Sequence, residues 1–385
     1  MIKHVERLLE SVIRKRFFEG KALLVYGARQ VGKTTLARQI LARLPHGTGV
    51  VFLNGDMPDT RLLLENATPE RIRVLLEGKK VLFIDEAQNI PEIGMILKRI
   101  VDTMPKIQVL VTGSSSFNLA NRTSEPLTGR KFEYTLTPFS FEELKNATDL
   151  PTERAKLEQR LIFGAYPEIA THEDDAAERL RSLAGSYLYK DVFALQAVRN
   201  PALLEKLLRA LALQCGSEVS YREVGQLIGL DNKTVERYVD ILCQCFILFT
   251  LPAFSRNARN ELKRSRKVYF LDCGIRNAVI GNFLPLAQRT DTGALWENYL
   301  VSERLKWRLA HAPDTRAYFW RTHNQAEVDL VEESAKGLSA FEFKWGEGRA
   351  ARIPAAFTSA YPDARVEIIT RANYDLFLLE KGRKQ

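Results

Sequence analysis

Runs of consecutive apolar residues set the pattern of the first third of the chain. Five such runs begin at Ala22, Val50, Val81, Ile107 and Phe132. A strand that is apolar along its length is typical of a parallel sheet that is covered on both faces. The pattern therefore predicts an α/β fold with a parallel sheet in residues 1–139.

Helical spacing takes over after these runs. Ser140 and Glu143 form a capping box, the pairing that marks the start of a helix. Two longer helices are predicted at 157–169 and 176–195. We therefore expect residues 140–199 to form a separate helical unit.

The next unit, residues 200–284, has the pattern of a helix-turn-helix. Gly229 lies in the turn, and Asp231 is placed to cap the helix that follows. Two helices joined by a short glycine-bearing turn are the helix-turn-helix layout. Strands after such a pair predict a winged helix. The expected elements are a helix from 202, helices at 221–228 and 232–243, and strands at 246–251 and 267–272.

The last unit, residues 285–385, has a different order of predicted helices and strands. A long helical pattern starts at Thr292 and is followed by three strand-like runs, a short helix and one more strand. The expected order is thus α-β-β-β-α-β. The three consecutive runs are at 316–322, 326–333 and 336–345, and the last is at 365–370.

A phosphate-binding loop follows the first apolar run. The segment GARQVGKT fits G-x-x-x-x-G-K-[ST] between a strand and a helix, which is the context that this motif requires. Lys33 is placed to reach the β- and γ-phosphates of ATP, and Thr34 to ligate Mg²⁺. The backbone of the loop and the first turn of the helix would hold the phosphates. The nucleotide-contacting residues expected here are Gly27, Ala28, Arg29, Gln30, Val31, Gly32, Lys33, Thr34 and Thr35.

A second motif, VLFIDEAQNI, ends the third apolar run in two carboxylates. Open α/β sheets place their ligands at the carboxyl ends of the strands. Asp85 therefore suits the Mg²⁺ shell, and Glu86 suits the polarisation of the attacking water. The alternative is a strand that merely ends in a solvated Asp-Glu pair.

The succession of five strands resembles the additional-strand class of P-loop ATPases, which includes the AAA+ proteins. In that class the polar tip of the strand after Asp-Glu senses the γ-phosphate, so the resemblance points to Ser114, which could instead cap a turn. An arginine finger also suits the chemistry, and Arg130 or Arg122 could act as one within the chain or from a neighbour. A solvated loop arginine is the alternative, and Arg130 is favoured because it directly precedes the fifth run.

Several motifs together resemble one group of bacterial and archaeal AAA-type ATPases with a C-terminal domain of unknown function. They are GARQVGKTTL, FIDEAQNI, VTGSSS, LTGRKFEYTLTPFSFEEL and SYLYKDV. The resemblance implies binding and hydrolysis of ATP with Mg²⁺. It also implies that residues 140–199 form a helical lid, because AAA-type proteins carry one at this place.

The helix-turn-helix pattern and the charge balance favour a DNA partner. The chain has a formal net charge of +9, which fits nucleic acid but does not require it. Residues near the start of the second helix, among them Lys233 and Arg237, could contact bases or phosphates. A helix-turn-helix that binds only protein is the alternative. A basic wing between the two strands would contain Arg256, Arg259, Lys263, Arg264, Arg266 and Lys267.

Carboxylates alternate along two neighbouring strands of the last unit. Glu327 and Asp329 share one face of their strand, as Glu342 and Lys344 share one face of the next. A turn centred on Ala335 and Lys336 would pair Asp329 with Glu342 and Glu327 with Lys344. Like charges directly opposite are destabilising unless something offsets the repulsion, and Mg²⁺ would do so through oxygen ligands.

This unit resembles the core of PD-(D/E)xK nucleases, a restriction-endonuclease-like fold. The resemblance implies metal ligation by Asp329 and Glu342, with Glu297 as a further ligand, and Lys344 as the residue that positions a water or stabilises charge. The alternative is a solvent-facing strand pair with Glu–Lys contacts, or a face that binds a phosphate backbone without cutting it.

The cysteine content and the hydropathy indicate the cellular compartment. The four cysteines form no CxxC pair, which indicates reduced thiols in a cytoplasmic protein and argues against a zinc site. No apolar run is long enough to cross a bilayer. We therefore expect an ATP-driven enzyme that acts on DNA and has a potential nuclease centre. The alternatives are a nucleotide-controlled regulator that binds DNA or protein without cutting, and an ATPase whose second half only mediates assembly. A protein partner and a homo-oligomer are both compatible with the sequence.

Overall fold

The first sheet is parallel throughout, as predicted. The computed structural model describes residues 4–65, 67–114, 127–194, 200–255, 266–322, 324–346 and 352–379, and for 186–194 the backbone alone. The strand order is β2-β3-β4-β1-β5, so β4 lies between the P-loop strand β1 and the Asp-Glu strand β3. The strands are β1 (Ala22–Tyr26), β2 (Val50–Asn54), β3 (Val81–Asp85), β4 (Gln108–Gly113) and β5 (Lys131–Thr135).

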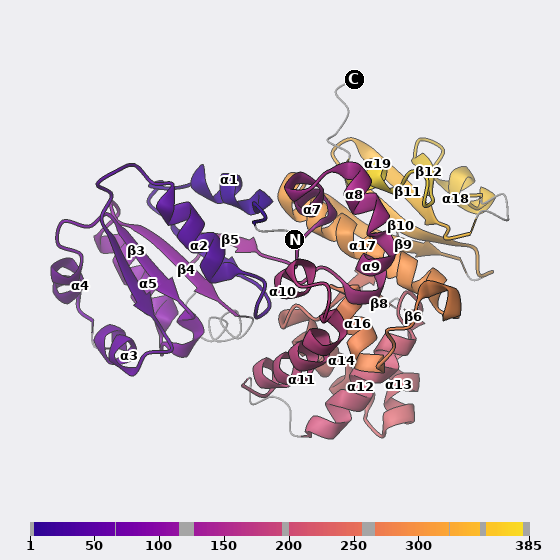
Figure 1. The fold of residues 1–385 in the computed structure, drawn as a ribbon, viewed down its shortest axis with the longest axis horizontal. Coiled ribbons are helices and arrows are strands. Elements are labelled where there is room, and N and C mark those ends of the chain that lie inside the picture. The colour runs from indigo at the N-terminus through magenta and orange to yellow at the C-terminus, as the bar shows by residue number, and fades with distance from the viewer. Residues whose placement is uncertain are drawn as a thin grey trace.

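Helices cover both faces of this sheet, which explains why its strands are apolar throughout (Figure 1). Leu23 and Val25 of β1 share one core with α1 and α2. Leu24, between them, belongs to a second core with α3, α4 and α5. The helices are α1 (Leu8–Arg14), α2 (Lys33–Ala42), α3 (Pro58–Glu65), α4 (Pro69–Leu75) and α5 (Ile93–Thr103), with a 3₁₀ turn η1 (Ala87–Asn89).

Short helices follow the sheet. The capping box at Ser140 and Glu143 is present, because each residue's side chain accepts a hydrogen bond from the other's backbone N–H. The single helix predicted at 157–169 is wrong, because the chain turns at Gly164 and a new helix starts at Pro167. The helices are α7 (Phe141–Ala147), α8 (Leu150–Ala155), α9 (Leu157–Phe163), α10 (Pro167–Thr171) and α11 (Ala176–Ala194).

A close approach fixes the break at Gly164. Its φ is 71°, and a Cβ atom there would lie 2.0 Å from Oδ1 of Asp272. The buried Asp272 carboxylate accepts hydrogen bonds from the backbone N–H groups of Ala165 and Ile275, so it cannot move aside without losing them. The contact ties this helical segment to the start of α16 (Cys273–Ile280).

Gly164→Ala is expected to destabilise the protein by about 2–4 kcal/mol, because it combines a left-handed backbone with overpacking against Asp272. The measurement is the free energy of unfolding from urea titration. Gly185→Ala is the matched control, since Gly185 lies in a helix with open space around its Cβ position. That change should instead stabilise by up to about 1 kcal/mol. Equal effects of the two substitutions would contradict the packing argument.

The helix-turn-helix elements predicted for the next unit are present. Gly229 ends the first of the two helices with a φ of 79°, and Asp231 caps the second through the N–H of Thr234. A three-stranded sheet in the order β6-β8-β7 includes a two-residue strand too short to be seen in the sequence pattern. The elements are α12 (Pro201–Leu213), β6 (Glu218–Val219), α13 (Tyr221–Ile228), α14 (Asn232–Gln244), β7 (Leu248–Pro252) and β8 (Arg266–Phe270).

The last unit has the predicted order α-β-β-β-α-β, with one further helix. Its sheet runs β12-β11-β10-β9, with β11 and β12 parallel and the other pairs antiparallel. The hairpin turns at Ala335 and Lys336 as expected, because Ser334 pairs with Gly337 and Leu330 with Phe341. After the 3₁₀ turn η2 (Leu286–Gln288), the elements are α17 (Thr292–His311), β9 (Arg316–Arg321), β10 (Glu327–Ser334), β11 (Gly337–Phe343), α18 (Ala355–Ala360), β12 (Arg365–Ile369) and α19 (Tyr374–Leu379).

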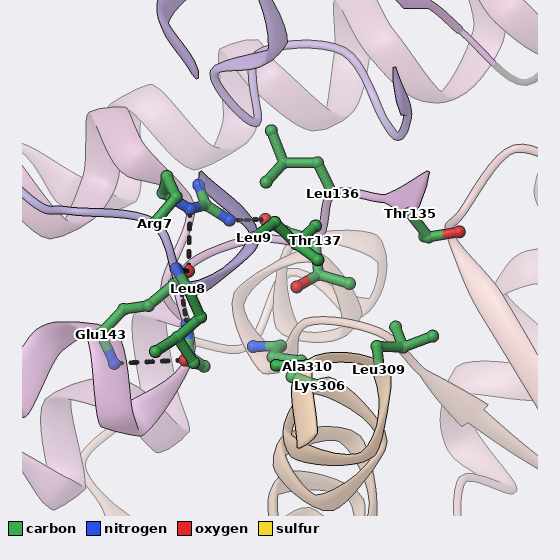
Figure 2. A pocket seen from close by; sticks show the side chains of 11 residues that line it. Arg7, Leu8, Leu9, Thr135, Leu136, Thr137, Glu143, Lys306, Leu309 and Ala310 are labelled. Atoms are coloured by element: carbon green, nitrogen blue, oxygen red, sulfur yellow. Dashed lines mark hydrogen bonds and ion pairs between the residues drawn. The ribbon is translucent and has the colours of Figure 1, made fainter. Parts of the chain in front are cut away.

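Helix α17 contacts the first unit at α1 and at the chain that follows β5. Lys306 donates to the carbonyl of Phe139 at 3.0 Å, and Glu303 accepts from the N–H of Phe141 at 2.7 Å. Both residues are buried. Figure 2 shows the joint, where α1, the end of β5, α7 and α17 meet around a cavity of about 20 Å³. The linker after β5 is thus fixed between the two units.

Candidate functional site

The P-loop connects β1 to α2, and two features shape it. Gly27 packs so closely on the chain after β5 that a Cβ atom would lie 2.2 Å from the carbonyl oxygen of Leu136. The buried ammonium of Lys33 donates to the carbonyls of Gly27 and Ala28, at 2.9 and 2.8 Å. The lysine therefore lies along the loop that would receive phosphate, and the first turn of α2 points its N–H groups at the same place.

The strand tips of β3 and β4 bring the predicted cation-binding groups to this loop. The hydroxyl of Thr34 donates to Oδ2 of Asp85 at 2.9 Å, and the hydroxyl of Thr112 donates to Oδ1. Asp85 is buried. Hydroxyl and carboxylate oxygens are the protein ligands that Mg²⁺ accepts beside nucleotide phosphates. These residues therefore fit a Mg²⁺ ion, with Thr34 and Asp85 as the groups that would hold it.

Glu86 and Ser114 are joined by a residue that sequence reasoning missed. The side-chain amide of Gln88 donates to Oε2 of Glu86 at 2.5 Å, and its oxygen accepts from the N–H of Ser114 at 3.1 Å. Glu86 has a φ of 48°, which turns it away from the line of β3. Gln88 orients Glu86 at the strand tips. Its position two residues after Glu86 is the signal that could have pointed to it.

Arg7 is a second residue that the sequence did not single out. Its guanidinium donates to the carbonyl of Thr137 after β5 and to the carboxylate of Glu143 in α7, at 2.5 and 3.0 Å (Figure 2). It also donates to the carbonyl of Val31 in the P-loop at 3.0 Å. It therefore supports the loop from behind. An arginine before the first strand carries no motif that would reveal this role.

Arg130 lies away from the P-loop. It immediately precedes β5, at the edge of the sheet where β1 begins with Ala22, whereas the P-loop follows the other end of β1. Its Nε is 2.5 Å from Oδ1 of Asp102. Arg130 therefore does not reach the γ-phosphate position within one chain. Arg122, the other candidate finger, lies outside the described residues.

The fold brings the predicted carboxylates of the last unit together with a lysine from elsewhere. The ammonium of Lys267, on β8, is 2.8 Å from Oε1 of Glu297, 3.8 Å from Oδ1 of Asp329, and in contact with Glu327. Directly after β11, Lys344 is 2.6 Å from Glu342, which lies on that strand. The side chain of Lys267 is only 1% exposed, so its expected place in a basic wing is wrong.

Burial and mutual repulsion perturb these groups. Burial, and then the charge of Asp329, raise the pKa of Glu297 to about 7. The same two causes raise the pKa of Glu342, and burial raises the pKa of Asp329 itself. Burial opposes the charge of Lys267, yet the carboxylates, Glu297 foremost, raise its pKa above the ordinary value. The hydroxyl of Tyr269 donates to Glu297 at 2.7 Å. The cluster thus consists of a buried ammonium among partly buried carboxylates whose charges influence one another.

The cluster does not have the form of a metal centre. Among the residues that the structure describes, no three histidine, cysteine or carboxylate side chains are grouped as metal ligands. The ammonium of Lys267 lies among the carboxylates instead. As arranged, Glu297, Asp329 and Glu342 do not fit a divalent cation.

The second helix of the helix-turn-helix presents cations to solvent. Asn232, Lys233 and Arg237 are exposed on α14. Thr234 is engaged at the cap, where its hydroxyl donates to Asp231 at 2.5 Å. The candidate wing residues from Arg256 to Arg264 lie outside the described part of the chain, and Arg266 begins β8. In the described segments, no helix combines the length and the apolar character that crossing a membrane would need.

Comparison with known proteins places the chain. Residues 19–145 match the family model of an AAA domain. Over 340 residues the chain is 30% identical to the uncharacterized protein Rv2008c of Mycobacterium tuberculosis. The aligned region covers 86% of this chain and 72% of that protein. The chain belongs to the family of Rv2008c. The uncharacterized protein MJ1544 of Methanocaldococcus jannaschii is 23% identical over 386 residues, covering 94% of this chain and 83% of that protein.

The rest of this Rv2008c-family chain matches two domains of unknown function, DUF8612 at residues 154–285 and DUF4143 at residues 292–382. Among solved structures, the replication initiator DnaA bound to AMPPCP and single-stranded DNA matches at a TM-score of 0.30 and 15% identity, over 61% of this chain and 86% of that one. Cdc6p from Pyrobaculum aerophilum matches at 0.29 and 14%, over 71% and 91%. The AAA domain and the parallel sheet make the first unit an AAA-type, nucleotide-binding ATPase domain.

Proposed function

We propose that this protein hydrolyses Mg²⁺-bound ATP at the P-loop and that the nucleotide controls how its second half binds DNA. The observation that carries the proposal is the convergence of Lys33, the Thr34–Asp85 pair and Glu86 at the tips of β1 and β3. These groups supply phosphate binding, cation binding and a base at one edge of the sheet.

Each residue has a distinct task in this reaction. Lys33 leaves the carbonyls of the loop and pairs with the β- and γ-phosphates. Glu86, held by Gln88, accepts a hydrogen bond from the attacking water and orients it toward the γ-phosphorus. Bound Mg²⁺ would neutralise charge on the phosphate oxygens. Ser114, linked to the same Gln88, is placed to report on the γ-phosphate.

A neighbouring copy is the source from which Arg130 could act as an arginine finger. Arg130 cannot serve the P-loop of its own chain, but its side chain is 39% exposed at the opposite edge of the sheet. A second copy that docks this edge against the P-loop would bring Arg130 to the γ-phosphate. The role expected for Arg130 is therefore proposed as one between copies.

DNA binding is proposed for the winged-helix unit. Support comes from the exposed Lys233 and Arg237 near the start of α14, where recognition helices contact base edges and phosphates. The double substitution Lys233→Ala/Arg237→Ala is expected to weaken binding of a labelled 30-bp duplex about tenfold and to lower the salt slope by about 2. Fluorescence anisotropy at several salt concentrations measures both.

The matched control is Lys79→Ala/Lys80→Ala, which removes two exposed lysines from the ATPase domain. This control should bind DNA as the natural protein does. Equal affinity of the α14 variant and the natural protein would remove α14 as the DNA contact. It would move the proposal toward a second half that binds only protein or mediates assembly.

Cleavage of nucleic acid is the second candidate activity. It is supported by the D-x(12)-E-x-K spacing of Asp329, Glu342 and Lys344 and by the hydrogen bond of 2.8 Å from the N–H of Phe343 to Asp329. Nicking of supercoiled plasmid with Mg²⁺ or Mn²⁺, with and without ATP, is the test. Metal-dependent nicking that disappears in both Asp329→Ala and Lys344→Ala would establish it. Intact ATP hydrolysis without nicking would leave a nucleotide-controlled regulator that cuts nothing.

A further inference from the structure

Lys267 enters the carboxylate cluster from outside the unit that builds it. Its strand, β8, belongs to the three-stranded sheet of the winged-helix unit, whereas Glu297 lies on α17 and both Glu327 and Asp329 lie on β10. The side chain is 1% exposed, so the charge has been moved out of water into this site. A buried ammonium is stable only where partners replace its hydration.

Three carboxylates lie around the Lys267 ammonium. Lys267 contacts Glu327, is 2.8 Å from Glu297, and is 3.8 Å from Asp329. Glu297 and Glu327 lie within hydrogen-bond reach of the ammonium, whereas Asp329 contributes its charge from slightly farther away. The ring of Phe319 lies 5.7 Å away on another side. Tyr269, two residues further along β8, also donates to Glu297, so the strand binds this carboxylate twice.

Further contacts fasten β8 and its sheet to the last unit. Arg321 of β9 is 2.8 Å from Glu218 of β6 and 3.5 Å from Glu327. The N–H of Phe254, just after β7, donates to the carbonyl of Phe319 in β9 at 2.6 Å. The position of Lys267 is therefore set by the docking of two sheets. Parting of the two sheets would take the ammonium out of the cluster.

We propose that Lys267 is the resident cation of this cluster and that it keeps divalent metal ions out while the two sheets are docked. A divalent ion drawn to Glu297 or Asp329 would have to approach a positive charge already within a few ångströms of both. The proposal deepens the cleavage candidate above, with which it shares the cluster, because it makes separation of the sheets the condition for a metal to enter.

The raised pKa values of Glu297 and Lys267 agree with this arrangement. The charge of Lys267 opposes the effect of burial on the pKa of Glu297, and the carboxylates in turn keep Lys267 charged. Removal of that cation leaves a buried negative site, which then attracts another cation. Lys267→Met is therefore expected to create a divalent-ion site where the natural protein has none.

The proposal is tested by titrating Mn²⁺ into the full chain without nucleotide. Electron paramagnetic resonance measures the free ion, and bound Mn²⁺ is obtained by difference. The natural protein and Asp329→Asn should bind the same number of Mn²⁺ ions. Any ion at the P-loop is present in both proteins and cancels in this comparison. Lys267→Met should bind one additional ion, with an affinity at least tenfold above any Asp329-dependent binding by the natural protein. Lys267→Met/Asp329→Asn should lose this ion. Lys267→Arg, which keeps the charge, should behave as the natural protein.

Lys267→Met should also melt at a lower temperature than the natural protein and regain part of the loss with Mn²⁺. If it does not fold, Lys267→Gln replaces it in the same titration. An Asp329-dependent ion in the natural protein would overturn the proposal, as would a folded, neutral variant that binds no additional ion. Plasmid nicking is scored separately: a Lys267 variant that binds the ion but does not nick supports the resident cation and removes the cleavage candidate.

Discussion

Replacing Lys33 by alanine is expected to reduce the affinity for ATP by about 100-fold or more, because charge-assisted bonds to two phosphates are each worth roughly 1.5–3 kcal/mol. Lys33 is the cation that the fold places inside the P-loop, held by the carbonyls of Gly27 and Ala28. A fluorescent ATP analogue titrated in the presence of Mg²⁺ measures the change.

Lys80→Ala is the matched control for this experiment. Lys80 is exposed just before β3, at the edge of the sheet opposite the P-loop, so its removal changes the net charge equally without touching the nucleotide. The control should bind ATP as the natural protein does. Undiminished ATP binding by a folded Lys33→Ala protein would show that the loop does not hold the phosphates in the way proposed.

Glu86→Gln is expected to retain ATP binding and to slow turnover by about 100-fold or more, the usual contribution of a general base. The amide keeps the shape of the side chain and removes the charge that polarises water. The contact with Gln88 can be kept, since an amide oxygen also accepts a hydrogen bond from its side-chain amide. Phosphate release under saturating ATP gives the rate, and the analogue titration gives the affinity.

Glu77→Gln serves as the comparison, because Glu77 is exposed and lies after α4, away from the strand tips. It should leave both rate and affinity within about twofold, as surface substitutions usually do. A turnover of the Glu86→Gln protein equal to that of Glu77→Gln would exclude Glu86 as the residue that activates water. Attention would then turn to Gln88 and Ser114, which adjoin it.

Local pattern was sufficient for much of the architecture. The five apolar runs were correctly predicted as a parallel sheet, because a strand that is buried on both faces is apolar at successive positions. The hairpin at Ala335 and Lys336 was placed correctly because alternation along two adjacent strands fixes their register. The P-loop was identified because its residues are contiguous and each does its work at a fixed spacing.

Local pattern failed where distant segments decide the outcome. The helix expected at 157–169 is broken at Gly164 by the carboxylate of Asp272, over 100 residues later in the chain. Arg130 was favoured because it adjoins a strand, but strand direction places it at the wrong end of the sheet. Arg7 carries no motif, and its role arises only from the segments that surround it.

The carboxylate cluster shows most clearly which features the sequence determines and which depend on the tertiary structure. By itself, the sequence determined that Glu327 and Asp329 share one strand face and lie against Glu342 and Lys344, because the two-residue period of a strand is a local property. Only the tertiary structure decided which cation occupies that face. Lys267 stands in a run of basic residues that reads as a solvated wing, and docking of two sheets buries it among carboxylates 30 or more residues away. Charge attraction at that range along the chain depends on how the units pack, which no local pattern encodes.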